Sequence, residues 1–130
     1  LYRFTGPFVK LFEHQTKVHF FELKPEIEEM TDHVVVIGAH RMGGPVVKFL
    51  QKEHIPFCVI DLNPHLVQEL AKDHITAFYG DAGDPEILDL VRLSEARLII
   101  STSQDMNDNE IILRESRHRR TKAILVMRAI

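Results

Sequence analysis

The sequence has little of several features that mark particular classes of protein. Its single cysteine, Cys58, rules out an intrachain disulfide framework and suits a reducing compartment. It contains no run of about 18 apolar residues, so no segment is expected to cross a membrane, and no secretory signal pattern. It also lacks a basic excess: the formal net charge is −3, whereas nucleic-acid-binding domains are normally basic.

Metal and thiol chemistry have equally little support. The eight histidines do not cluster at ligand spacings on one predicted face, which disfavours a structural zinc site. Cys58 lies in an apolar run and is expected to be a core residue rather than a nucleophile. What the 130 residues do contain is 45% apolar side chains, enough for one compact domain and a tail.

The chain divides into two regions. In residues 1–32 aromatic and charged side chains are mixed, and the spacing of Phe8, Leu11 and Phe12 predicts a short amphipathic helix, followed by an acidic linker. Residues 33–130 alternate short apolar runs with helical patterns. The expected strands are Val34–Ile37, Phe57–Ile60, Thr76–Tyr79, Arg97–Ile100 and Ala123–Met127, and the expected helices are Pro45–Lys52, Pro64–Lys72, Pro85–Leu93 and Glu110–His118.

This alternation predicts an α/β fold. Short, nearly continuous apolar runs are typical of strands buried on both faces of a parallel sheet. Asn63-Pro64 and Asp84-Pro85 are typical helix starts, because the side-chain oxygen accepts a free backbone N–H and proline suits the first helical position. With short, right-handed crossovers, the order predicts a Rossmann-like, doubly wound parallel sheet of about five strands with helices on both faces.

The turn after the first expected strand has the chemistry of an anion site. It reads Gly38-Ala39-His40-Arg41-Met42-Gly43. Gly38 and Gly43 occupy the first and third glycine positions of a G-x-G-x-x-G pattern, which serve a tight turn and close helix packing. His40 replaces the middle glycine, which favours phosphates lying farther out or a mononucleotide ligand. The helix N-terminus offers N–H donors to phosphate, and His40 and Arg41 are expected to add to them.

An acidic residue follows at the spacing of a ribose-binding carboxylate. Asp61 lies 23 positions after Gly38 (61 minus 38), at the end of the second expected strand. Leu62 comes next instead of an arginine, so NADP is disfavoured relative to NAD or AMP. The competing interpretation is a ligand-free Rossmann-like module in which Gly38 and Gly43 serve only the turns.

Polar residues at the ends of two further strands leave alternatives open. Asp81 is either a contact to the adenine or ribose or a turn residue, and the small Ala82 would leave room for a ligand. Asp84 is expected to be a helix cap. Ser101 and Thr102 are either ligand contacts, since the carboxyl ends of parallel strands face the crevice, or solvated turn hydroxyls.

A basic run lies late in the last expected helix. It consists of Arg114, Arg117, Arg119 and Arg120. The simpler interpretation is a solvated C-terminal turn that the helix dipole favours, and the alternative is contact with a polyanion.

Taken together, residues 33–130 resemble the N-terminal lobe of an RCK domain, also called KTN or TrkA-N. The resemblance is carried by His33–Gly43, Asp61, Tyr79–Pro85 and Asp105–Asn109. The Gly-Asp-Ala run within Tyr79–Pro85 is its most specific part, because ordinary dehydrogenases seldom carry it. It implies a domain that regulates potassium channels, Trk-type transporters or Kef-type cation:proton antiporters, binds NAD(H), AMP, ADP or ATP, and dimerises.

The resemblance also implies a site and a setting. The implied contacts are Gly38, His40, Arg41, Gly43, Asp61, Asp81 and Thr102. His40 departs from the usual glycine, and Asn63 stands where many members have a second acid. Residues 1–32 resemble the juxtamembrane exit of a Kef-type antiporter. That implies a fragment, the regulatory piece of a membrane transporter at the cytoplasmic face of the cell membrane.

Three functional hypotheses follow. The first is a nucleotide sensor without catalysis, which gates ion transport through rearrangement of a homodimer. The second is a small NAD-dependent oxidoreductase, against which stand the missing substrate domain and the missing acid–base partner for hydride chemistry. The third is a dimerisation module that binds no ligand.

Overall fold

The described part of the chain is built on one parallel sheet. The computed structural model describes residues 29–39 and 43–128. Its strands lie in the order β3-β2-β1-β4-β5, all neighbours being parallel. They are β1 (Val34–Ile37), β2 (Phe57–Asp61), β3 (Ala77–Tyr79), β4 (Leu98–Ser101) and β5 (Ile124–Met127). The predicted doubly wound Rossmann-like α/β fold is therefore confirmed, whereas the helix predicted around Phe8–Phe12 lies outside the described residues.

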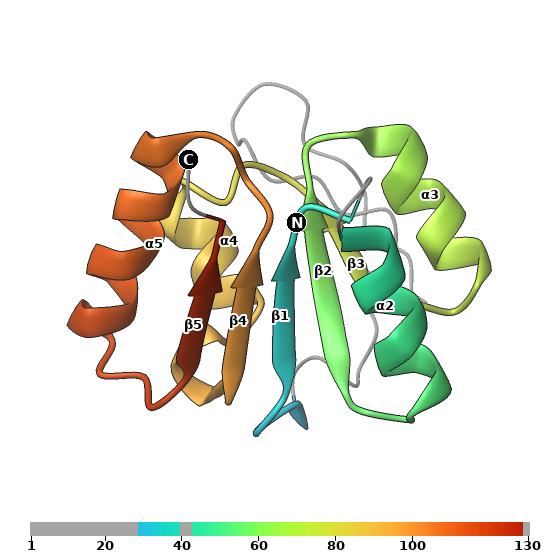
Figure 1. Cartoon of the computed structure of the whole chain (residues 1–130), viewed down its shortest axis with the longest axis horizontal. Coiled ribbons are helices and arrows are strands. Elements are labelled where there is room, and N and C mark those ends of the chain that lie inside the picture. The colour runs from blue at the N-terminus through green and yellow to red at the C-terminus, as the bar shows by residue number, and fades with distance from the viewer. Residues whose placement is uncertain (1–28, 40–42, 129–130) are drawn as a thin grey trace, which may run out of the picture.

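Helices cover both faces of this sheet (Figure 1). They are α2 (Gly43–Lys52), α3 (Pro64–Lys72), α4 (Pro85–Leu90) and α5 (Met106–His118), with a 3₁₀ turn at Leu93–Glu95. Two separate buried clusters show which helix packs on which face. Val47 of α2 and Val67 of α3 pack with Val34 and Val36. Helices α4 and α5 belong to the other cluster.

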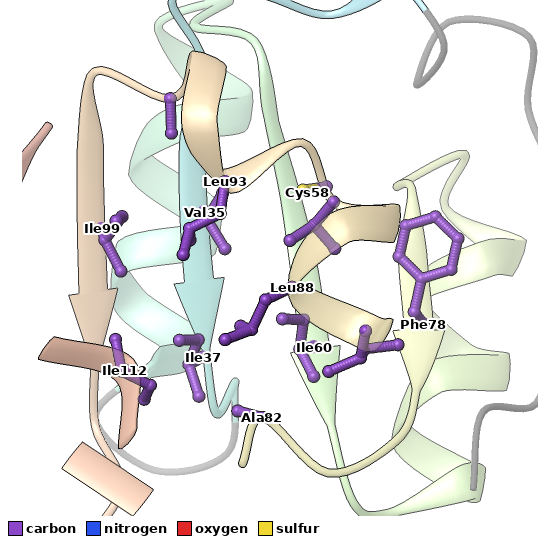
Figure 2. Close-up of a cluster of buried hydrophobic side chains, with 13 residues drawn as sticks. Val35, Ile37, Cys58, Ile60, Phe78, Ala82, Leu88, Leu93, Ile99 and Ile112 are labelled. Atoms are coloured by element: carbon purple, nitrogen blue, oxygen red, sulfur yellow. The ribbon is translucent and has the colours of Figure 1, made fainter. Parts of the chain in front are cut away.

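The side chains of β1 explain this two-sided core. All four are buried, and because successive side chains of a strand point to opposite faces, the strand feeds both clusters. Val34 and Val36 join the α2–α3 side, while Val35 and Ile37 join the α4–α5 side. Figure 2 shows the second cluster, in which Leu88 of α4 lies against the strands.

Three predicted helix boundaries are wrong, and the first is the start of α2, which lies at Gly43 rather than Pro45. Helix α5 begins at Met106 rather than Glu110, because Asp105 caps it by accepting hydrogen bonds from the backbone N–H groups of Asn107 and Asp108. Its first turn is polar and shows no apolar periodicity. Helix α4 ends at Leu90, short of the expected Leu93, and the left-handed Arg92 (φ 55°) then leads into the 3₁₀ turn.

One side of the sheet stays partly uncovered. β5 is an edge strand, and its Ile124 and Val126 are 68% and 50% exposed. In Figure 1, α2 and α3 lie on the side of β1, β2 and β3 and leave β5 open.

None of the helices in the described ranges has the length and apolar character needed to cross a bilayer.

Candidate functional site

A pocket lies at the carboxyl ends of the strands, at the point where the strand order reverses between β1 and β4. The chain runs outward from β1 to β2 and β3 on one side and returns through β4 and β5 on the other. Such a switch point is where open α/β sheets bind ligands. The described residues that line the pocket are Ile37, Gly38, Ile60, Asp61, Leu62, Gly80, Ala82, Thr102, Ser103 and Asp108.

The two glycines of the first turn are required by close contacts. Gly38 has φ of +85°, and a Cβ there would lie 2.3 Å from Thr102 Oγ1. A Cβ on Gly43 would lie 1.9 Å from the carbonyl oxygen of Gly38. The hydroxyl of Thr102 is within hydrogen-bonding distance of the carbonyl oxygens of Ile37 (3.1 Å) and Gly38 (3.0 Å). The turn is therefore fitted tightly against both α2 and the end of β4.

Asp61 is the polar anchor on the β2 side. Its Oδ2 accepts a hydrogen bond from the backbone N–H of Ala39 (2.8 Å), and its Oδ1 accepts one from Asn63 (2.8 Å). The carboxylate thus ties the glycine turn to the end of β2. A carboxylate has about four acceptor positions, so about two remain for further donors. Leu62, which is 62% exposed, lines the pocket beside it.

The loop between β3 and α4 contributes backbone and one small side chain. Ala82 is buried and lines the pocket. Asp84 caps α4 by accepting from the N–H of Glu86 (3.0 Å), as expected. Asp81 accepts from the N–H of Gly83 (2.8 Å) and is not among the lining residues. Asp81 therefore has a turn role, and its contact to a ligand stays a prediction.

The two polar residues at the end of β4 have different surroundings. Thr102 lines the pocket. Ser101 is buried, and its hydroxyl donates to Asn109 Oδ1 (2.7 Å), which ties β4 to α5. Ser101 thus makes a structural contact to α5 and is not among the described pocket-lining residues. The predicted ligand contacts of His40, Arg41 and Met42 lie outside the described residues.

Sequence reasoning missed five lining residues: the backbone or apolar groups of Ile37, Ile60 and Gly80, and the polar side chains of Ser103 and Asp108. Asp108 belongs to the first turn of α5, and Ser103 Oγ lies 3.5 Å from its Oδ2. Burial raises the pKa of Asp108, and the negative charges of Asp81 and Asp105 raise it further, while the Ser103 contact opposes them. The available signal was the Asp105 cap, which would have moved the start of α5 and brought Asp108 to the edge of the pocket.

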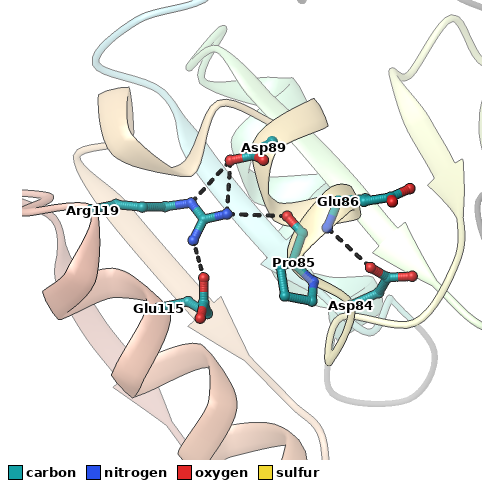
Figure 3. Close-up of polar contacts among 6 residues, drawn as sticks. All are labelled: Asp84, Pro85, Glu86, Asp89, Glu115 and Arg119. Carbon is teal, nitrogen blue, oxygen red and sulfur yellow. Dashed lines mark hydrogen bonds and ion pairs between the residues drawn. The ribbon is translucent and has the colours of Figure 1, made fainter.

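Two other predicted groups have structural roles. Cys58 is fully buried, and burial raises the pKa of its thiol to about 12, so it stays protonated and unreactive. Arg119 lies between α5 and α4, where it contacts Asp89 (2.7 Å), Glu115 and the carbonyl oxygen of Pro85 (Figure 3). Neither of the two interpretations of the basic run accounts for Arg119.

No metal-binding cluster is found in residues 29–39 and 43–128. No group of three or more histidine, cysteine, aspartate or glutamate side chains there is arranged to hold a metal ion. The described lining residues contribute two carboxylates, Asp61 and Asp108, and two hydroxyls, Thr102 and Ser103.

Most of the described residues match a known protein family. Residues 34–130 match the TrkA-N domain. The chain belongs to the TrkA-N family. The match covers all five strands of the sheet.

The chain spans only a small part of the curated relatives that it matches. It is 35% identical to a putative K⁺ efflux antiporter KefB of Alkalimonas amylolytica over 88 residues, which make up 68% of this chain and 13% of the antiporter. The crystal structure of the TrkA-N domain of the inner membrane protein ybaL from Escherichia coli matches with a TM-score of 0.74 and 26% identity, covering 78% of this chain and 75% of that one.

A structure of the GsuK channel bound to NAD shares the fold. It matches with a TM-score of 0.67 and 20% identity, over 77% of this chain and 18% of that one. The same fold thus occurs in a channel that is described with NAD bound.

Proposed function

We propose that this TrkA-N domain binds an adenine nucleotide, NAD(H) or AMP, with ADP and ATP as further ligands, and regulates ion transport without catalysing a reaction. The observation that carries the proposal is Asp61. Its carboxylate stands at the end of β2, is held by two backbone N–H groups and keeps free acceptor positions beside the pocket. Those positions suit the two hydroxyls of an adenine ribose.

The proposed pose follows from the elements around the turn. The start of α2 offers backbone N–H groups to the phosphates, together with His40 and Arg41. Gly80 and Ala82 leave room on the β3 side for the adenine. A 2′-phosphate would meet the Asp61 carboxylate, so NADP is disfavoured.

The proposed setting is a membrane transporter. The matched part makes up 13% of a putative K⁺ efflux antiporter, so we infer that the transport domain belongs to the same polypeptide and that this domain lies at the cytoplasmic face of the membrane. Gating would require a nucleotide that binds one arrangement of a homodimer more tightly than another.

An oxidoreductase is the second candidate. A Rossmann-like fold serves both binding and hydride transfer. The described lining residues include no histidine, the side chain that most often exchanges protons in catalysis. This composition favours binding without turnover.

Thermal stabilisation by ligands tests the proposal. NAD⁺, NADH, AMP, ADP or ATP at 100 times its dissociation constant should add about 2.7 kcal/mol to the free energy of unfolding. We expect Asp61→Asn to lose this stabilisation, because the amide replaces one acceptor oxygen by a donor. Asp73→Asn, an exposed change of the same kind at the end of α3, should keep it.

Three results would contradict the proposal. If no adenine nucleotide stabilises the unsubstituted chain, the ligand-free dimerisation module takes its place. If NADP⁺ stabilises the chain as strongly as NAD⁺, the role given to Asp61 is wrong. If the chain turns over NAD⁺ with a reduced substrate, the oxidoreductase takes precedence.

A further inference from the structure

The pocket has two chemically different sides. Asp61 lies on the β2 side, and Thr102, Ser103 and Asp108 lie on the β4–α5 side. A dinucleotide has two nucleosides joined by a pyrophosphate. In the proposed function, the adenine ribose binds to Asp61 and the pyrophosphate binds at the glycine turn. The second nucleoside then extends towards Asp108.

A pair of carboxylates lies at this side of the pocket, with Asp108 in the lining and Asp81 next to Asp108. Asp108 Oδ1 and Asp81 Oδ1 each lie 3.2 Å from the position of a Cβ on Gly83. The two oxygens are therefore at most 6.4 Å apart (twice 3.2). Because Gly83 has no side chain, nothing from that residue separates them.

No positive side chain of the described lining offsets this charge. The lining residues in residues 29–39 and 43–128 include Asp61 and Asp108 but no lysine or arginine. The pocket is partly enclosed by apolar residues such as Ile37 and Ile60, and charges interact more strongly there than in bulk water. A ligand group that reaches Asp108 is thus favoured when it is positive.

NAD⁺ and NADH differ in this property. Their phosphates, adenines and riboses are the same, but the nicotinamide ring is positively charged in NAD⁺ and neutral in NADH. In the ratio of their affinities, the contacts on the Asp61 side cancel. The ratio therefore measures the electrostatic potential at the second nucleoside.

We propose that Asp108, held beside Asp81 across Gly83, is a specificity-determining residue that makes this pocket prefer NAD⁺ to NADH. The proposal rests on the proposed function, since it assumes that a nicotinamide dinucleotide occupies the pocket. It names the property of the ligand that the pocket distinguishes, the redox state of the nicotinamide ring, and the residue responsible for the distinction.

Calorimetric titration of the full chain with NAD⁺, NADH and AMP tests the proposal. We expect NAD⁺ to bind about tenfold more tightly than NADH, the size of effect that one partly screened charge pair gives. In Asp108→Asn, which keeps the shape and removes the charge, the ratio should fall towards one. Glu110→Gln, an exposed change of the same kind two residues further along α5, should leave the ratio as it is.

AMP separates the possible failures. It lacks the nicotinamide, so retained AMP binding shows that the pocket of Asp108→Asn is intact. If NAD⁺ and NADH bind equally, or if the ratio survives in Asp108→Asn, this proposal is overturned while the proposed function stands. If none of the three ligands binds the unsubstituted chain, the proposed function itself fails.

Discussion

At the scale of single residues, two neighbouring glycines of α2 have different surroundings. A Cβ on Gly43 would lie 1.9 Å from the carbonyl oxygen of Gly38, a distance that no side-chain movement relieves because the obstacle is backbone. A Cβ on Gly44 would lie 3.5 Å from the carbonyl oxygen of Ala39, which is ordinary contact. Only Gly43 is therefore required by packing.

We expect Gly43→Ala to lower the free energy of unfolding by about 1–3 kcal/mol, because the turn and α2 must move apart. Gly44→Ala should change it by less than about 1 kcal/mol, since alanine suits a helix better than glycine. Urea denaturation of both variants measures the difference. Equal effects would show that the turn adapts to a methyl group.

The site residues differ in how far the sequence predicts them. Gly38, Gly43 and Asp61 follow from spacing, because a glycine turn between a strand and a helix has few alternatives. The hydrogen bond that Asp61 accepts from the backbone N–H of Ala39 depends on how β1 and β2 pair, which spacing does not reveal. Asp108 was missed because its place in the pocket depends on where α5 begins.

At the scale of elements, Arg119 joins α5 to α4. Its side chain is 13% exposed and contacts Asp89 of α4 and Glu115 of its own helix (Figure 3). Arg117 is exposed. The sequence alone does not distinguish the arginines of this run from one another. Which of them faces α4 depends on the direction in which the last turn of α5 points.

Arg119→Met should lower the free energy of unfolding by about 1–3 kcal/mol, because a half-buried Glu115 loses a charge-assisted hydrogen bond. Arg117→Met should change it by no more than about 0.5 kcal/mol. Thermal and chemical denaturation give both values. A result with the two variants alike would mean that the contact to α4 contributes nothing measurable.

The elements themselves were largely predictable. Every expected strand and helix of residues 33–130 exists, since buried parallel strands and capped helices leave clear patterns. The errors lie at helix ends that apolar periodicity does not mark. The polar first turn of α5 and the left-handed Arg92 after α4 are two such ends.

At the scale of the whole molecule, a buried histidine couples stability to pH. His33 has no exposed surface, and its Nε2 lies 2.8 Å from the carbonyl oxygen of Val91. Its Nδ1 is buried without a hydrogen-bond partner. Burial lowers the pKa of His33 below its ordinary 6.5, helped by Arg92 and opposed by the contact to Val91 and by the charges of Glu95 and Asp32.

The stability of the chain should therefore fall as the pH drops below about 6.5. In that range the unfolded chain binds a proton at His33 that the folded chain does not, so protons favour unfolding until the lower folded pKa is passed. His33→Gln should flatten this part of a plot of unfolding free energy against pH. His118→Gln, a change at an exposed histidine, should not. An unchanged slope in His33→Gln would assign the pH dependence to other groups.

The two hydrogen bonds that Asp61 accepts affect how the rest of the molecule would respond to a ligand. With Ala39 and Asn63 already hydrogen-bonded to it, this half of the site is ordered before any ligand arrives. Little conformational entropy is then lost on binding, which favours affinity. For the same reason, binding causes little structural change on this side that could be transmitted to other elements. We therefore expect any change of shape to start in α4 and α5, with the β1–β2 side serving as the fixed frame against which they move.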